Sequence, residues 1–170
     1  NKLNNYVIGN PKQVRVDNFN YVFIRQDPPY NMEYISSMHL LEQVKGPTKF
    51  INHPNGIRNA PEKISMLSYK KIIPPTVITR EKKEINDFIK QNGKCVIKPL
   101  YGNGGESIFL LDKQDENYNQ IIERFIDQLK EPFIIQKFLP EIKHGDKRII
   151  LVNGEPIAAL RRIPKNNEIR

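Results

Sequence analysis

The segment from Lys98 to Ser107 holds the residues with the clearest chemical potential. Lys98 is followed by a loop that contains three glycines and ends at a serine: Gly102, Gly104, Gly105 and Ser107. Glycines let backbone N–H groups approach a phosphate closely, and the Lys98 ammonium can meet the same phosphate. The Gly-Lys-Ser/Thr ending of a P-loop is absent, and a strand is expected next rather than a helix. The pattern indicates a hairpin that closes over a nucleotide, although a plain glycine-rich turn has the same composition.

A second segment, 136–140, is the end of an apolar strand followed by an extended stretch at Pro140. Backbone groups there can hydrogen-bond the edge of an adenine, while Phe138 and Leu139 can pack against its ring. A strand that simply ends in a turn is the alternative interpretation.

A third segment, Gly145-Asp146-Lys147-Arg148, places an acid and an arginine two residues apart. On a strand, Asp146 and Arg148 therefore face the same side. A carboxylate can hold ribose hydroxyls, and a guanidinium can hold a phosphate through two hydrogen bonds. A surface ion pair is the alternative here.

The elements that position these segments follow from residue periodicity. From residue 76 the pattern predicts an α+β unit with two helices on one face of a mainly antiparallel sheet. Its elements are strand 76–79, helix 80–91, strand 95–98, strand 107–111, helix 117–130 and strand 133–138. Strands 147–152 and 156–162 then flank Asn153-Gly154, a strong hairpin signal because both residues tolerate positive φ.

The first 60 residues show a less regular pattern. We expect a buried strand at 21–24 that leads into a polar loop, and a helix over 32–44 that stops at Gly46-Pro47. Residues 55–60 are expected to be irregular, and Pro61 to begin another helix.

Composition narrows the function classes. The chain has 170 residues, 38% of them hydrophobic, so it can bury a core. No apolar run approaches the roughly 20 residues that a membrane span needs. One cysteine, Cys95, excludes a disulfide framework, indicates the cytoplasm and is expected to be a buried small side chain. The three histidines show no metal-ligand spacing.

The net charge of +8, from 27 basic and 19 acidic residues, favours an anionic partner. Nucleic acid is one alternative, because 136–170 holds eight basic and four acidic residues. Such a module needs exposed aromatics between the charges, and this segment offers only Phe138. We therefore expect neither a nucleic-acid nor a membrane partner.

Taken together, the motifs resemble the ATP-grasp superfamily and, within it, the bacterial-type glutathione synthetase family. The resemblance runs in order through roughly residues 20–170. The matching phrases are Arg25-Gln26-Asp27-Pro28-Pro29-Tyr30, Glu62-Lys63, Lys98-Pro99-Leu100 with its glycines, Ser107-Ile108-Phe109, Gln136, Leu139-Pro140, Gly145-Asp146-Lys147-Arg148, Asn153-Gly154-Glu155-Pro156 and Arg162-Ile163-Pro164. The phrase from Arg25 to Pro29 is specific to this family, whereas the glycine-rich loop occurs in ATP-grasp ligases more widely.

The resemblance implies a partial ATP-grasp fold of mixed α/β and α+β class in three parts. Residues 1–60 would end an N-terminal α/β substrate domain, 61–145 would form the antiparallel β-α-β-β-α-β lid domain, and 146–170 would begin the C-terminal domain. The implied reaction joins γ-glutamylcysteine to glycine through an acyl phosphate, with ATP as the phosphoryl donor. Another ATP-grasp carboxylate–amine ligase is the near alternative, and the Arg25–Pro29 phrase disfavours it.

Roles transfer from the family residue by residue. Arg148 and Arg162 would stabilise charge on the transferring phosphoryl group. Arg25, Asp27 and Arg170 would bind the peptide substrate. The implied ATP-binding residues are Lys63, Lys98, Gly102, Gly104, Gly105, Ser107, Gln136, Lys137, Leu139 and Asp146.

The family also implies Mg²⁺, with Mn²⁺ as an alternative, and a homo-oligomer. Its metal ligands correspond to positions beyond Arg170, so we expect no metal site within these residues. This chain by itself is expected to be inactive.

Overall fold

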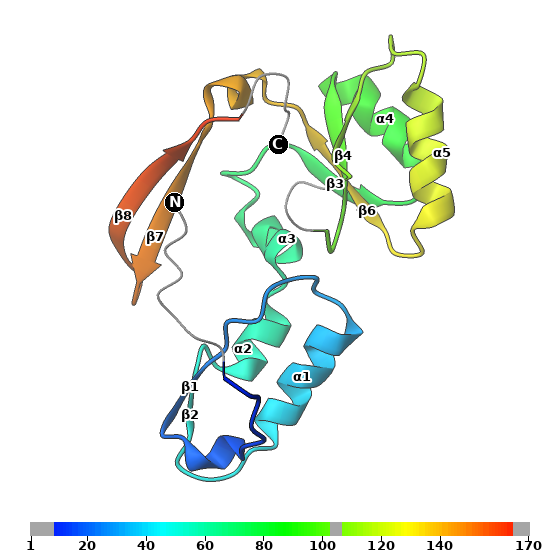
Figure 1. Cartoon of the computed structure of the whole chain (residues 1–170). Helices are drawn as coiled ribbons and strands as arrows, with labels where there is room; N and C mark the ends of the chain where they lie inside the picture. The colour runs from blue at the N-terminus through cyan, green and yellow to red at the C-terminus, as the bar shows by residue number, and fades with distance from the viewer. Residues whose placement is uncertain (1–8, 103–106, 165–170) are drawn as a thin grey trace. The chain divides into compact units, whose positions relative to one another are not determined.

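The computed structural model describes residues 9–102 and 107–164, which fall into two compact units, one up to Ala60 and one from Pro61 onward (Figure 1). Within these ranges no helix is both long and apolar enough to cross a membrane. The elements in chain order are η1 (Val16–Asn18), β1 (Tyr21–Phe23), α1 (Met32–Glu42), β2 (Lys49–Ile51), α2 (Pro54–Asn59), α3 (Glu62–Ser65), η2 (Met66–Tyr69), β3 (Thr76–Thr79), α4 (Lys82–Asn92), β4 (Cys95–Pro99), β5 (Phe109–Leu111), α5 (Tyr118–Gln128), β6 (Phe133–Lys137), η3 (Pro140–His144), β7 (Asp146–Val152) and β8 (Glu155–Arg162).

In the first unit, β1 and β2 form a parallel pair, and α1 packs with α2. The expected buried strand at 21–24 is wrong in one respect: Tyr21 is 58% and Phe23 65% exposed. Both side chains point to the same face of the pair, because alternate residues of a strand do so. No described element covers that face, whereas Val22 on the other face is half-buried.

The irregular segment expected at 55–60 is also wrong, since α2 occupies most of it. The Nδ1 atom of His53 accepts a hydrogen bond from the Asn55 amide and caps the helix, and Pro54 occupies its first turn, where its fixed φ is favourable. Arg58 then reaches both carboxylate oxygens of Glu42 on α1, at 3.0 and 3.1 Å. These contacts offset the weak helix propensity of Gly56, and the last two operate across elements that a sequence pattern does not connect.

In the second unit, a four-stranded antiparallel sheet has the order β3-β6-β4-β5. Helices α4 and α5 lie on one face of it (Figure 1). The predicted succession of strand, helix, two strands, helix and strand is therefore confirmed. The helix α4 ends at Gly93, whose φ of +74° is a conformation that glycine adopts readily.

The core of this unit fills the space between the sheet and the two helices. Phe125 of α5 makes edge-to-face contacts with Phe109 and Phe133, with ring centroids 6.0 and 5.3 Å away. Cys95 is fully buried there, as expected. The buried members are Ile85, Ile89, Cys95, Ile97, Leu111, Tyr118, Ile122, Phe125, Phe133 and Ile135.

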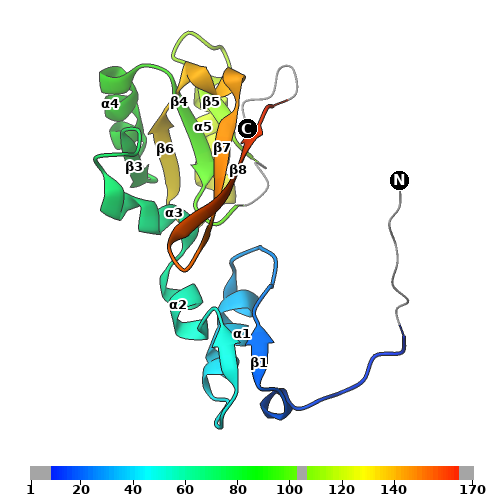
Figure 2. The same cartoon turned by 90° about the vertical axis from the view of Figure 1, so that its left-hand side faces the viewer.

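The last described strands, β7 and β8, pair as an antiparallel hairpin, drawn from a second direction in Figure 2. Asn153 and Gly154 form its turn with φ values of +52° and +84°, so the predicted hairpin is confirmed.

Candidate functional site

The sheet of the second unit carries a polar cluster on the face opposite α4 and α5. Ile97 and Ile135 point into the core, so their neighbours Lys98 and Gln136 point to the other face. The register places Thr76 directly across from Gln136. Lys98, Gln136 and Thr76 are all half-buried, which limits the solvent that surrounds their polar atoms.

The Lys98 ammonium has a neutral hydrogen-bond partner. Its Nζ atom donates to Oε1 of Gln136 at 2.9 Å. Burial lowers the pKa of Lys98, and the nearby charge of Lys63 lowers it further, while Glu62 opposes both. Lys98 makes no ion pair with a carboxylate in the described part of the chain.

Lys63, on α3, holds the entrance to the glycine-rich loop. Its Nζ atom donates to the carbonyl oxygens of Pro99 and Gly102, at 2.7 and 2.6 Å. Burial lowers the pKa of Lys63 as well, and Glu62 partly offsets this. Gly102 is closely surrounded at this contact, since a Cβ atom there would lie 3.2 Å from Cβ of Pro99 and 3.7 Å from Nζ of Lys63.

The two lysines therefore form a cationic site without a neutralising carboxylate among their hydrogen-bond partners. A partly desolvated ammonium on a neutral acceptor gains strongly from an anion, because the anion offsets its charge. An ammonium has three donors, and Lys63 uses two and Lys98 one on the atoms named above. The remaining donors suit the oxygens of a polyphosphate.

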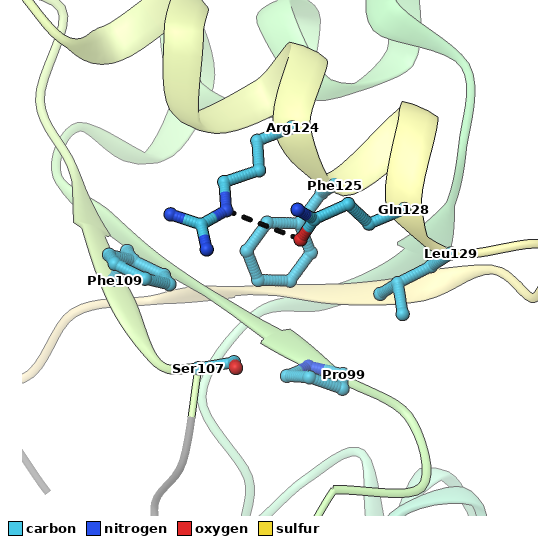
Figure 3. Close-up of a pocket in the computed structure, with 7 residues that line it drawn as sticks. All are labelled: Pro99, Ser107, Phe109, Arg124, Phe125, Gln128 and Leu129. Atoms are coloured by element: carbon cyan, nitrogen blue, oxygen red, sulfur yellow. Dashed lines mark hydrogen bonds between the residues drawn. The ribbon is translucent and has the colours of Figure 1, made fainter.

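Ser107 lines a hollow on the helix-covered side of the sheet (Figure 3). Its φ is +55°. Figure 3 shows Ser107 and Pro99 on the strand side of the hollow, with Arg124 and Gln128 of α5 opposite them. The hollow has a volume of about 60 Å³, and the Arg124 Nε atom donates to Gln128 Oε1 across its rim at 3.2 Å. Gly104 and Gly105 lie outside the described residues.

The remaining strand-end candidates have different surroundings. Lys137 is exposed, and its side chain lies on the same face as Cys95, opposite to Gln136. Its backbone N–H donates to the Pro75 carbonyl at 2.9 Å. Leu139 is 47% exposed and directly precedes η3.

The hairpin joins two predicted site residues directly. The Arg162 Nε atom donates to Oδ1 of Asp146 at 2.8 Å, and its Nη2 atom donates to the other carboxylate oxygen. This arginine lowers the pKa of Asp146, and Arg148 lowers it further. Gly145 lies at the same end, where a Cβ atom would lie only 2.2 Å from the Arg162 carbonyl oxygen.

The predicted substrate residues fall in other parts of the chain sequence. Arg25 and Asp27 belong to the first unit and lie exposed after β1. Arg170 lies outside the described residues.

Thr76 is the site residue that sequence reasoning missed. Its hydroxyl oxygen accepts a hydrogen bond from Nε2 of Gln136, the residue that accepts from Lys98, yet Thr76 lies 60 positions before Gln136 in the chain. Only the pairing of β3 with β6 brings the two together, and no local pattern shows that pairing.

No group of three or more metal-ligating His, Cys, Asp or Glu side chains occurs in residues 9–102 and 107–164. We therefore assign no metal ligand to the described residues.

Models of two domains of one protein family match consecutive parts of this chain. The family model for the prokaryotic glutathione synthetase ATP-grasp domain matches residues 62–170, and the model for the N-terminal domain of the same family matches 1–58. Glutathione synthetase of Rhodopseudomonas palustris is 44% identical over 97% of this chain, and that of Synechocystis sp. 45% identical over 88%. The chain covers 53% and 47% of these two proteins, so it spans about half the length of its curated relatives.

Solved structures agree on the fold. The D-cycloserine synthetase DcsG has a TM-score of 0.71 at 16% identity, with 90% of this chain and 55% of DcsG covered. A RimK-domain ATP-grasp protein from Sphaerobacter thermophilus has a TM-score of 0.61 at 18% identity, covering 85% and 55%. These likenesses confirm the partial ATP-grasp fold. With both family models matched in order along its length, this chain belongs to the prokaryotic glutathione synthetase family.

Proposed function

We propose that this chain supplies the nucleotide-binding part of an enzyme that ligates γ-glutamylcysteine to glycine with ATP. The observation that carries the proposal is the pair of half-buried ammonium groups, Lys63 and Lys98, at the entrance to the glycine-rich loop. Within the described residues both have neutral hydrogen-bond acceptors, and both have donors left for phosphate oxygens. Family membership supports the choice of substrates.

The proposed reaction has two steps. The cysteinyl carboxylate of γ-glutamylcysteine attacks the γ-phosphorus of ATP, which forms an acyl phosphate and releases ADP. The glycine amine then attacks the acyl carbon, phosphate leaves with the bonding electron pair, and the amine loses a proton. The product is glutathione.

Within this scheme, the residues of this chain bind and position. Lys63 and Lys98 hold the phosphates, and a nucleotide that contacts Lys63 is thereby linked to the carbonyls of Pro99 and Gly102. Arg148 and Arg162 offset negative charge as the phosphoryl group moves, a role that needs positioned cations rather than acid–base chemistry.

The other predicted residues keep their proposed roles. The backbone around Gln136, Lys137 and Leu139 would line the adenine, and Asp146 would hold the ribose. Because Asp146 already accepts two hydrogen bonds from Arg162, a nucleotide would have to share this carboxylate with that arginine. Glycines 102, 104 and 105 with Ser107 would cover the phosphates, and Arg25, Asp27 and Arg170 would bind the dipeptide.

We propose Mg²⁺ as the cation that accompanies ATP. The ATP-grasp ligase PsnB, a fold relative with a TM-score of 0.53 at 21% identity, was solved with Mg and ADP. Since the described residues offer no metal cluster, the metal is not given a role in the steps above.

The proposal further places domain boundaries at 60/61 and 145/146. It takes the protein as cytoplasmic and homo-oligomeric, with small molecules rather than nucleic acid or membranes as partners. Size-exclusion chromatography with light scattering tests the oligomeric state.

The test of function is ADP release by the protein that carries this chain. It is incubated with ATP, Mg²⁺ and glycine, with and without γ-glutamylcysteine. We expect ADP only when the dipeptide is present. ATP binding without dipeptide-dependent ADP would refute the substrate assignment and favour another ATP-grasp carboxylate–amine ligase.

A further inference from the structure

A continuous chain of hydrogen bonds crosses three neighbouring strands of the sheet and ends at Lys98. Lys98 Nζ on β4 donates to Gln136 Oε1 on β6 at 2.9 Å. Gln136 Nε2 donates to Thr76 Oγ1 on β3 at 2.8 Å. The Thr76 hydroxyl in turn donates to the Pro74 carbonyl at 2.7 Å.

The direction of this chain is fixed by the chemistry of its members. A lysine ammonium only donates, so the Gln136 amide must turn its oxygen toward Lys98. Its NH₂ group then faces Thr76, whose oxygen must accept. The Thr76 hydroxyl proton is then donated to the Pro74 carbonyl. Each donor in this chain of hydrogen bonds therefore faces an acceptor.

Lys98 depends on this arrangement more than an exposed lysine would. The Gln136 oxygen is its hydrogen-bond partner in the described residues, and no described carboxylate pairs with it. The charge of Lys63 acts against the charged form of Lys98. If the Gln136 amide reversed, its NH₂ group would face the ammonium, and two donors would oppose each other.

We propose that Thr76 is a positioning residue for phosphate binding, because it fixes the Gln136 amide and through it the Lys98 ammonium. The inference rests on the proposed function, in which Lys98 binds a phosphate of ATP. It adds a residue that touches neither the nucleotide nor the reacting atoms.

The test compares two substitutions at this position. Thr76→Val keeps the branched shape and removes the hydroxyl, which frees the amide to reverse. Thr76→Ser keeps the hydroxyl and is expected to restore the chain of hydrogen bonds. Thr48→Val is the matched control, because the buried Thr48 hydroxyl has no hydrogen-bond partner among the described residues.

The measurement is calorimetric binding of ATP and of adenosine to the protein that carries this chain, with thermal midpoints recorded for each variant. We expect Thr76→Val to weaken ATP binding about tenfold, because a reversed Gln136 amide no longer accepts the charge-assisted hydrogen bond that positions Lys98, and to leave adenosine binding within about twofold. Thr76→Ser and Thr48→Val should bind ATP within about threefold of the unaltered protein.

Two results would overturn the inference: unchanged ATP binding by Thr76→Val, or an equal loss for ATP and adenosine, which indicates general disruption of the sheet. A failure of the unaltered protein to bind ATP would instead refute the proposed function, and this inference with it.

Discussion

Replacing Gly145 with alanine is expected to open the β7–β8 hairpin at the end where Asp146 faces Arg162. Gly145 has φ of +89° and ψ of +175°, a region that is accessible almost only to glycine and costs other residues about 1–3 kcal/mol. The added Cβ atom would lie 2.2 Å from the Arg162 carbonyl oxygen, whereas real Cβ contacts are not shorter than 3.0 Å. The strands must therefore separate by roughly 0.8 Å, the difference between those two distances.

Such a separation weakens the ladder where Asp146 pairs with Arg162, and each main-chain hydrogen bond lost there costs about 1 kcal/mol. The sum of backbone strain and two lost bonds is about 3–5 kcal/mol. Gly154→Ala is the matched control in the same hairpin. Its φ of +84° implies about 1–2 kcal/mol of strain, but nothing lies within 4 Å of the added Cβ.

The assay is amide hydrogen exchange read by mass spectrometry on peptides from β7 and β8. Protection should fall at least about fivefold more in Gly145→Ala than in Gly154→Ala, since the two costs differ by at least roughly 1 kcal/mol. Peptides from β4 and β6 should be unchanged in both variants. Equal loss of protection in the two variants would refute the reasoning from the close approach to Arg162.

Three further predictions concern the core and the lysine site. Phe125→Ala should lower the free energy of unfolding, measured by urea denaturation, by about 3–5 kcal/mol, because Phe125 is only 4% exposed. Phe19 is 46% exposed, so Phe19→Ala should lower it much less. Equal losses for the two variants would contradict the packing described. Burial raises the pKa of Cys95 from its ordinary 9.0 to about 11. At pH 8 the thiolate fraction of Cys95 is therefore roughly 90-fold lower than that of a thiol with the ordinary pKa. Iodoacetamide should accordingly modify the folded protein far more slowly than the urea-unfolded one. Burial lowers the pKa of Lys63 and of Lys98, and an anion binds the charged forms of both side chains. The affinity for ATP should therefore fall as the pH rises, and the fall should begin below the ordinary lysine pKa of 10.5. An affinity that stays constant from pH 7 to 10 would contradict this.

The sheet and its helices could be predicted because local signals decide them. The apolar stripe of α5 recurs at helical spacing, and Asn153-Gly154 determines a tight hairpin turn by its own conformational preference. By contrast, α2 depends on His53 as a cap and on an ion pair between Arg58 and Glu42, so its helix was missed. The exposure of β1 depends on which elements cover the sheet, and strand composition does not report this.

The candidate site was predictable by residue type but not by contact. The sequence indicates Lys98 and the glycines as candidate phosphate-binding groups, because an ammonium and closely approaching backbone N–H groups suit a phosphate. It does not indicate that Lys63 holds the loop entrance, since its partners are backbone carbonyls 36 and 39 residues away. Arg162 and Asp146 were assigned separate roles, yet the register of β7 and β8 makes them partners.

The most direct test of the proposed ligase chemistry follows one oxygen atom. γ-Glutamylcysteine labelled with ¹⁸O in its cysteinyl carboxylate is incubated with the protein that carries this chain, ATP, Mg²⁺ and glycine, and the released phosphate is analysed by mass spectrometry. If the carboxylate attacks the γ-phosphorus, one labelled oxygen must leave with inorganic phosphate when glycine displaces it. We therefore expect one ¹⁸O atom in each phosphate formed. Phosphate without label, or label in AMP, would contradict the acyl phosphate and with it the proposed function.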